Sequence, residues 1–324
     1  PNKLAFIIAI VVTATILSCD STSRESQESI PNSIRDKEKK IKTKITREYD
    51  LVEKFGEFSE EFYAKLKYEY DENGHELSSI EYERKDETKI ITVIRSEYNE
   101  RGDKIKISHF SEDGKFSSGS LYKYEYDENG NILKELRYSD EGSLRAADGY
   151  VYDSQGRILT EIHYDIIDDA GNLKEHRKRV YQYEDAGKRV LMKRFDDGKI
   201  TAFHTYKYDQ ENRLVSEEFF DTKLDQQIYH WVYEFNERGN KTAMFSKNSN
   251  GSISSYSNYH YDVSNNMIKE IRGKQDTNRY HEYSDLEYNK YDDLVKNIDY
   301  ELRERFGEVE PYPVWVTYTE YEYY

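Results

Sequence analysis

Five basic side chains recur at one place in a repeating pattern and are the residues best suited to contact a ligand. They are His109, Arg137, His163, Arg194 and Arg272, and each follows an aromatic residue by eleven positions. Glutamates stand two positions before this column in several copies of the pattern. Such alternation fits either cross-strand ion pairs on a solvated sheet or a contact stripe for a binding partner, and both interpretations stay open.

No motif for a chemical reaction accompanies these residues. The sequence lacks Gly-x-Ser-x-Gly, a P-loop, a dinucleotide fingerprint and His-Glu-x-x-His. The segment Asp127-Glu128-Asn129-Gly130 superficially resembles a calcium loop but lacks Gly at the sixth place and Glu at the twelfth. Catalysis needs one asymmetric arrangement of nucleophile, base and oxyanion donors, which a regular repeat does not supply. We therefore expect no enzyme activity, no cofactor and no metal.

The elements that position these residues are copies of one unit, clearest at residues 122–142, YKYEYDENGNILKELRYSDEG. The unit recurs at intervals of 25 to 31 residues, which indicates a repeat array. The second aromatic of each copy serves as its anchor, and the anchors are Tyr70, Tyr98, Tyr126, Tyr152, Tyr183, Tyr208, Phe235, Tyr261 and Tyr291.

Two columns after the anchor predict a tight turn. An acid or amide follows every anchor, and the fourth position after it holds Gly or Asn in eight copies, while the copy anchored at Tyr291 lacks the turn residue. Gly and Asn tolerate a positive φ better than other residues. Asp before a type I turn that ends on such a residue is typical of a three-residue hairpin with a G1 bulge.

The repeats therefore predict an all-β fold, a long antiparallel meander of hairpins with about 18 strands, two per copy. Open sheets rarely exceed ~10 strands without curling or splitting, so the meander should coil. The residue two before the anchor and the aromatic twelve after it, as in Tyr124 and Tyr138, should share an aromatic, concave face. The charged column should occupy the opposite face. Residues 311–324, rich in aromatics, should form the closing strand.

The repeat resembles the YD (RHS) repeat family of bacterial surface and secreted proteins. The closest match to its Tyr-x-Tyr-Asp-x-x-Gly-Arg-Leu pattern is YVYDSQGRIL at residues 150–159, and the resemblance covers roughly residues 66–291. Most copies lack the Arg, and the second hairpin of each copy is longer. We expect no toxin-like core domain after the repeats. The resemblance implies a surface-exposed repeat scaffold.

The N-terminus predicts export and a lipid anchor. Residues 4–17 form an apolar run that is too short for a membrane span and fits a signal peptide over residues 1–18. The run ends Ile-Leu-Ser-Cys, which resembles a bacterial lipobox, and Cys19 is the only cysteine. We expect Cys19 to carry lipid, residues 19–44 to form a flexible tether, and residues 45–324 to form the repeat domain. A cleaved secretory signal with an incidental cysteine is the alternative.

Composition restricts the partners. The chain has 64 acidic and 48 Lys and Arg side chains, a net charge of −16, which argues against nucleic-acid binding. We expect a lipoprotein of the bacterial cell envelope, at the outer membrane or the cell surface, whose non-catalytic scaffold binds a protein or envelope partner. The alternative is a carbohydrate-binding lipoprotein that uses exposed aromatic side chains. The two differ in whether the tyrosines are buried or solvent-exposed.

Overall fold

The computed structural model describes residues 40–324, apart from 168–170, 275–281 and 306. These residues belong to one compact unit, Lys40–Tyr324. The predicted signal peptide, Cys19 and most of the predicted tether lie outside the described residues. None of the residues described forms a helix long and apolar enough to cross a membrane.

The described chain forms twenty strands. They are β1 (Ile41–Lys54), β2 (Glu57–Tyr70), β3 (Glu76–Tyr82), β4 (Ile90–Tyr98), β5 (Lys104–Ser111), β6 (Phe116–Tyr126), β7 (Ile132–Ser139), β8 (Leu144–Tyr152), β9 (Ile158–Ile166), β10 (Leu173–Tyr183), β11 (Arg189–Asp196), β12 (Lys199–Tyr208), β13 (Leu214–Asp221), β14 (Gln226–Phe235), β15 (Lys241–Lys247), β16 (Ile253–Tyr261), β17 (Met267–Lys274), β18 (Glu282–Tyr288), β19 (Leu294–Arg305) and β20 (Glu308–Tyr323).

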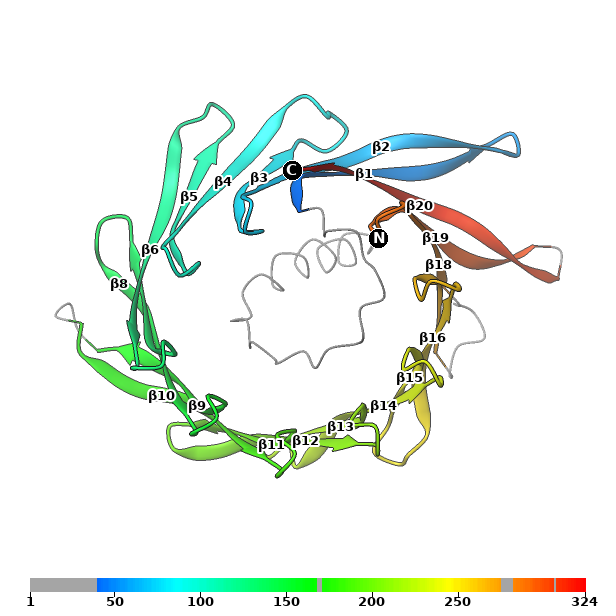
Figure 1. Ribbon diagram of the computed structural model, residues 1–324. Coiled ribbons are helices and arrows are strands. Elements are labelled where there is room, and N and C mark those ends of the chain that lie inside the picture. The colour runs from blue at the N-terminus through cyan, green and yellow to red at the C-terminus, as the bar shows by residue number, and fades with distance from the viewer. Residues whose placement is uncertain (1–39, 168–170, 275–281, 306) are drawn as a thin grey trace. The chain divides into compact units, whose positions relative to one another are not determined.

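Each strand pairs antiparallel with the strand that follows it, and β20 pairs with β1, so the sheet closes on itself (Figure 1). The predicted all-β hairpin array and closing strand are confirmed. The expected number of about 18 strands is too low because β1 with β2 and β19 with β20 form two additional long hairpins. Strand β1 includes residues 41–44, which the sequence analysis assigned to the tether.

The turns have the predicted chemistry. Gly130 has φ of 87° and Asn212 has φ of 62°, and the Gly130 amide donates to the Asp127 carbonyl. The Asp127 side chain also accepts hydrogen bonds from the Asn129 and Asn131 amides. Nine described turns follow an anchor, and eight of them, including the turn at Asp127, have the same two side-chain contacts. The other seven residues are Asp71, Asn99, Asp153, Asp209, Asn236, Asp262 and Asn289.

The last copy keeps its turn, contrary to the prediction. Asn289 caps it and Asp292 has φ of 65°. The prediction placed the anchor at Tyr291, whereas the structure places it three residues earlier, at Tyr288. Asp in the left-handed position hid this turn, because Gly or Asn is the usual residue there.

The predicted division into an aromatic and a charged face is wrong. Tyr124 pairs with Glu135, so these side chains share a face, whereas Tyr138 pairs with Leu121 on the opposite face. The register shifts by one residue just before the anchor Tyr126, and a one-residue shift moves every later side chain to the other face. The same shift precedes the anchors of the other hairpins, such as Tyr152 and Tyr208. Each face therefore mixes aromatic and charged columns.

The two faces differ in exposure. His204 and Glu217, on the face of Tyr206, have side chains that are only 12% exposed, whereas the Lys207 side chain on the other face is 66% exposed. Burial also raises the pKa of Tyr150, which belongs to the same face as Tyr206. Side chains converge on the concave side of a closed sheet, so we assign this more shielded face to the inside. We call it the inner face, and its opposite the outer face.

The strand number sets the width of the ring. Twenty strands spaced ~4.8 Å apart and tilted by ~40° give a wall roughly 40 Å in diameter. Facing side-chain layers need ~10 Å between backbones, so an opening of roughly 30 Å remains along the axis. Side chains from opposite walls cannot fill such a ring. Among residues 40–324 as described, the hydrophobic stabilisation must therefore come from contacts along the sheet.

On the outer face, cations cover the aromatic column twelve after the anchor. The Lys123 ammonium lies 4.9 Å from the Tyr138 ring centre, and the Arg95 guanidinium lies 4.9 Å from that of Phe110. Long side chains of this kind cover rings with their methylene stems and keep their charge in water. This arrangement explains how aromatic residues can lie on the convex side of the sheet.

Most of the anchor tyrosines hold their hairpin to the preceding one. The Tyr152 hydroxyl donates to the Ile132 carbonyl at 2.8 Å, and Ile132 is the first residue of β7. The anchors Tyr98, Tyr183, Tyr208, Tyr261 and Tyr288 make the same contact to the first residue of the preceding return strand. In β6 the residue two before the anchor, Tyr124, makes this contact in place of Tyr126, and Tyr321 of β20 makes it to β19. We call this contact the tyrosine staple. The Tyr and Asp of the repeat are therefore both structural.

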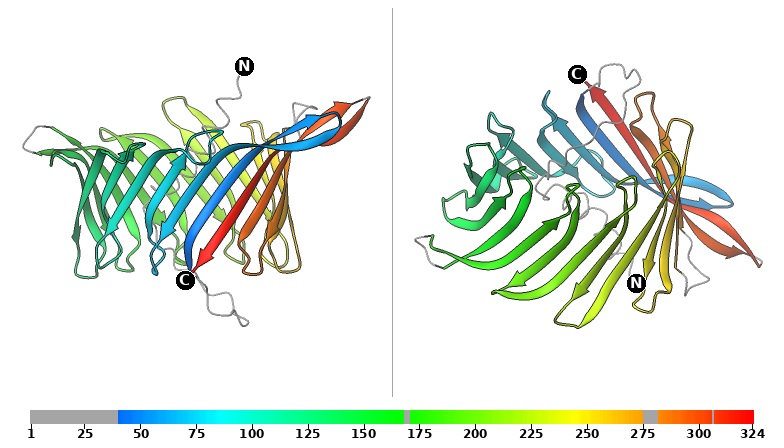
Figure 2. Two further views of the ribbon diagram at one scale, coloured as in Figure 1. Left: turned by 90° about the horizontal axis from the view of Figure 1, so that it is seen from above. Right: turned by 60° about the horizontal axis from the view of Figure 1, so that its bottom comes forward.

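Two long hairpins extend beyond the rest of the ring (Figure 2). One is formed by β1 and β2 and the other by β19 and β20, and we call them the first and second fingers. Aromatic contacts join the fingers near their bases, where the ring centres of Tyr63 and Trp315 lie 4.8 Å apart. Farther out, Phe58 contacts Tyr312 at 5.2 Å.

Candidate binding face

The five predicted contact residues all lie on the inner face, on β5, β7, β9, β11 and β17. The strand pairings place each of them in one consistent set of side chains, through pairs such as Tyr122 with Arg137 and Asp148 with His163. The structure therefore brings the predicted column to one face. It does not make the residues immediate neighbours, because at least one strand separates each pair of them.

Most of the column is engaged with polar neighbours. His163 Nδ1 lies 2.8 Å from Asp148 Oδ1, and Arg194 Nε donates to Thr201 Oγ1 at 3.0 Å. Arg272 pairs with Glu270 at 3.2 Å. Arg137 is exposed on β7 near Glu135, whose pKa is raised by burial and only partly offset by Arg137. The column is therefore partly a set of ion pairs, and Arg137 and Arg272 are its exposed arginines.

Sequence reasoning missed two cations that enlarge this column. Arg177 pairs across the strands with His163, and Arg179 pairs with Arg194, so all four side chains share the inner face of β9 to β11. The counter-charges are Asp196, 3.4 Å from Arg177 Nε, and Glu161, 3.1 Å from Arg179 Nη1. The basic run at residues 174–179 could have indicated these cations. It lies before the anchor Tyr183, on β10, whereas the predicted column was counted eleven residues after each anchor.

A second polar cluster on the inner face surrounds His204 on β12. His204 Nε2 lies 3.2 Å from Glu217 Oε2, and its Nδ1 lies 3.0 Å from the Tyr206 hydroxyl. The Tyr233 hydroxyl donates to the other oxygen of Glu217. Although burial opposes it, the hydrogen bonds from His204 and Tyr233 lower the pKa of Glu217. The carboxylate is thus held ionised and already satisfied, which suits it to structural support.

Three rings form a row beside this cluster. The centre of the Tyr229 ring lies 5.3 Å from that of Phe219 and 4.3 Å from that of Trp231, and both pairs are stacked within 16° of parallel. Burial raises the pKa of Tyr229 to about 12. The stacked faces of the three rings contact one another and are not open to a ligand. Only the ends of the row remain to stack on a flat ligand.

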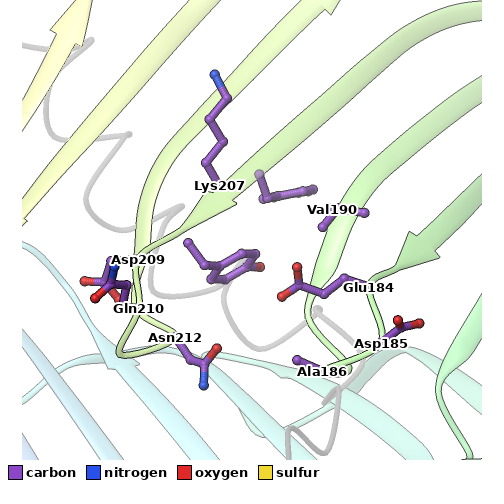
Figure 3. A pocket seen from close by; sticks show the side chains of 10 residues that line it. Glu184, Asp185, Ala186, Val190, Lys207, Asp209, Gln210 and Asn212 are labelled. Carbon is purple, nitrogen blue, oxygen red and sulfur yellow. The ribbon is translucent and has the colours of Figure 1, made fainter.

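A shallow hollow lies at the rim, between the turns that follow β10 and β12 (Figure 3). Its lining includes Glu184, Asp185 and Asp209, with Val190 and Asn212. Glu184 is the one anchor-following residue that is neither Asp nor Asn. Asp209 is already paired with Arg213 at 2.7 Å. Within the residues described, no group of three or more His, Cys, Asp or Glu side chains could hold a metal ion.

Comparisons with known proteins give only distant likenesses. No protein family matches the chain, and the search of curated proteins returned no match.

Among solved structures, the Tc toxin complex TcdB2-TccC3 matches 74% of this chain at 13% identity and a TM-score of 0.40, and this chain covers 14% of that one. A porin-like protein from Bacteroides uniformis matches 87% of this chain and 98% of its own at 13% identity and a TM-score of 0.35. This chain spans only 14–16% of the toxin chains that it matches. With every TM-score below 0.5, these likenesses carry no function to this chain.

Proposed function

We propose that this protein is a non-catalytic scaffold of the bacterial cell envelope that binds a segment of a protein partner on its inner face. One observation carries the proposal. The signature Tyr and Asp of the repeat are committed to staples and turns, whereas the inner face carries Arg or His at the same place in five copies, with Glu two positions before it in several. A repeated surface suits an extended contact better than a reaction, which needs one asymmetric group of residues.

The width of the ring fits such a contact. An opening of roughly 30 Å admits an extended chain or a helix, which is ~10–12 Å across with its side chains. The cations on β7, β9, β10 and β11 would face an acidic segment of the partner, while the acidic remainder of the chain would repel acidic segments elsewhere. Arg137 and Arg194 are the side chains that we expect to contribute most.

Affinity capture from envelope extract tests the proposal. Wild type is compared with Arg137→Glu plus Arg194→Glu, and with a matched control, Arg145→Glu plus Arg238→Glu, which changes exposed cations outside the column. We expect the partner to be lost only with the first double variant. Equal recovery with both double variants, at unchanged thermal stability, would exclude the inner face as the contact surface.

The lipid anchor is a separate part of the proposal and rests on the lipobox-like sequence before Cys19. The resemblance to YD-repeat proteins of the bacterial surface agrees with this location. Cys19→Ser should move the protein from the membrane fraction to the soluble fraction of cells. A variant that stays in the membrane fraction, together with wild type that carries no lipid by mass spectrometry, would refute anchoring.

Carbohydrate binding is the second candidate, and the row Phe219, Tyr229 and Trp231 is the observation that favours it. Sugars stack on ring faces, and in this row the faces are largely used by the neighbouring ring. We therefore rank it second. A glycan array with wild type and Trp231→Ala decides the matter, because binding that depends on Trp231 and is indifferent to Arg137 and Arg194 would favour the glycan.

A further inference from the structure

The tip of the first finger carries a residue that the fold does not explain. Phe55 and Gly56 form the two-residue turn between β1 and β2, with Lys54 paired to Glu57. Phe55 has φ of 57° and Gly56 has φ of 84°. The Phe55 side chain is fully exposed. This turn ends a hairpin that extends beyond the ring (Figure 2), so a large apolar side chain is exposed to solvent at the end of a long hairpin.

Turn chemistry would select a different residue at this position. A two-residue turn with both φ values positive favours Asn-Gly or Asp-Gly, and a non-glycine residue in the left-handed region costs roughly 1–2 kcal/mol. Asn and Asp reduce this cost because their side chains hydrogen-bond locally, which Phe cannot do. Phe55 therefore weakens the turn without being buried, and strain of this kind is characteristic of functional positions.

The second finger repeats the sequence of the first. Residues 54–57 read Lys-Phe-Gly-Glu and residues 305–308 read Arg-Phe-Gly-Glu. Arg305 pairs with Glu308 as Lys54 pairs with Glu57, and Gly307 has φ of 85°. The two longest hairpins of the protein thus share one four-residue pattern at their ends. The sequence contains no further Phe-Gly pair.

The surroundings of Phe55 indicate the chemistry of its partner. Phe58 on the first finger is 45% exposed and Val309 on the second is 61% exposed, so both fingers have exposed apolar side chains near their ends. On the first finger Glu57 and Glu60 are exposed, while Lys54 beside Phe55 pairs with Glu61 at 2.9 Å. On the second finger Glu308 and Glu310 are exposed. The whole chain carries a net charge of −16.

We propose that the first finger docks on a second protein by inserting Phe55 into an apolar pocket with a rim of Lys and Arg. Charge complementarity favours this occupant, because acidic flanks match a basic rim. An anionic bilayer would repel the same flanks, and a second copy of this chain would repel them equally. Aromatic side chains that become buried in a pocket of the partner typically contribute much of the binding energy at protein interfaces. The contact is separate from the inner face, so each proposal can fail alone.

The test starts with a photo-crosslinking phenylalanine analogue, p-benzoyl-phenylalanine, at position 55 of the full-length protein in cells. The crosslinked protein is identified and purified, and its affinity is titrated against wild type and Phe55→Asn. Asn suits the turn better than Phe, so this variant removes the ring and keeps the finger folded. The matched control is Val263→Asn, because Val263 is 90% exposed on a different turn.

We expect Phe55→Asn to raise the melting temperature slightly while lowering the affinity about tenfold or more, and Val263→Asn to leave the affinity unchanged. That combination separates a contact residue from a structural one. The proposal fails if Phe55→Asn lowers the melting temperature, or if the affinity is unchanged. It also fails if position 55 crosslinks only to a second copy of the chain, or if Phe55→Asn abolishes flotation with phosphatidylethanolamine–phosphatidylglycerol vesicles.

Discussion

The tyrosine staple predicts a measurable contribution to stability, and one repeat that naturally has Phe in place of Tyr serves as a control. Tyr152→Phe removes the hydroxyl that donates to the Ile132 carbonyl at 2.8 Å and keeps the ring. A hydrogen bond of this kind contributes ~0.5–1.5 kcal/mol net. Among the anchors, only that of β14 is Phe, Phe235, and the corresponding acceptor is the carbonyl of Leu214, the first residue of β13. Phe235→Tyr in the wild type should therefore add a staple and increase the unfolding free energy by about as much as Tyr152→Phe decreases it.

The assay is urea unfolding with a thermal melt as a second measure. Tyr152→Phe should lower the free energy of unfolding by ~1 kcal/mol, which for a domain of this size shifts the melting temperature by ~2 °C, with an unchanged m-value. Phe235→Tyr should raise both. The control is Tyr82→Phe, because the contact of Tyr82 is the Lys65 ammonium, 4.2 Å from its ring centre. A loss in Tyr152→Phe no larger than in Tyr82→Phe would refute the staple as a source of stability.

Three further predictions concern turns, closure and acid. Gly130→Val should cost about 1–3 kcal/mol because it places a β-branched residue at a φ of 87°, whereas Asn212→Gly should be neutral or slightly stabilising; equal losses in thermal melts would contradict a shared left-handed position. Deleting residues 127–152, which removes β7 and β8, should leave a folded protein because the ring can close with two strands fewer, and a circular dichroism spectrum without strand signal would contradict this. The unfolding free energy should rise as the pH falls from 7 towards about 5 and decrease below about 4: burial raises the pKa of Glu135 above its ordinary 4.5, so its penalty disappears on protonation, and despite opposing burial the hydrogen bonds to Asp153 lower its pKa below 3.8, so its contribution is lost in acid. Glu135→Gln should flatten the rise, and a profile unchanged by it would show that this carboxylate is not responsible.

The sequence predicted the local structure well because each repeat states its own turn. Asp127 and Gly130 define a hairpin whatever surrounds it, and the structure has that hairpin. The faces were mispredicted because the extra register shift beside Tyr126 leaves no residue signature of its own. The last strand was predicted, but its pairing with β1 was not predictable, because these strands lie some 270 residues apart in the sequence.

The candidate site was predictable as a column but not as a surface. His163 and Arg194 could be aligned from the anchor spacing, whereas Arg177 and Arg179 join them only through pairings across β9, β10 and β11. Phe55 could be read in the sequence, but its significance depends on its exposure and its φ value, which only the structure shows.

The pairing of the last strand with the first has a consequence for how the protein matures. Until β20 arrives, β1 exposes a row of unpaired backbone groups, and so does the most recently formed strand. Lys40 and Tyr324 then come together, with the Tyr324 amide donating to the Lys40 carbonyl at 3.0 Å. Contacts between such distant segments form late and slowly. A chain that is still being synthesised would therefore have two unpaired sheet edges until its last strand forms, and two such unfinished chains could pair with each other as an interlocked dimer.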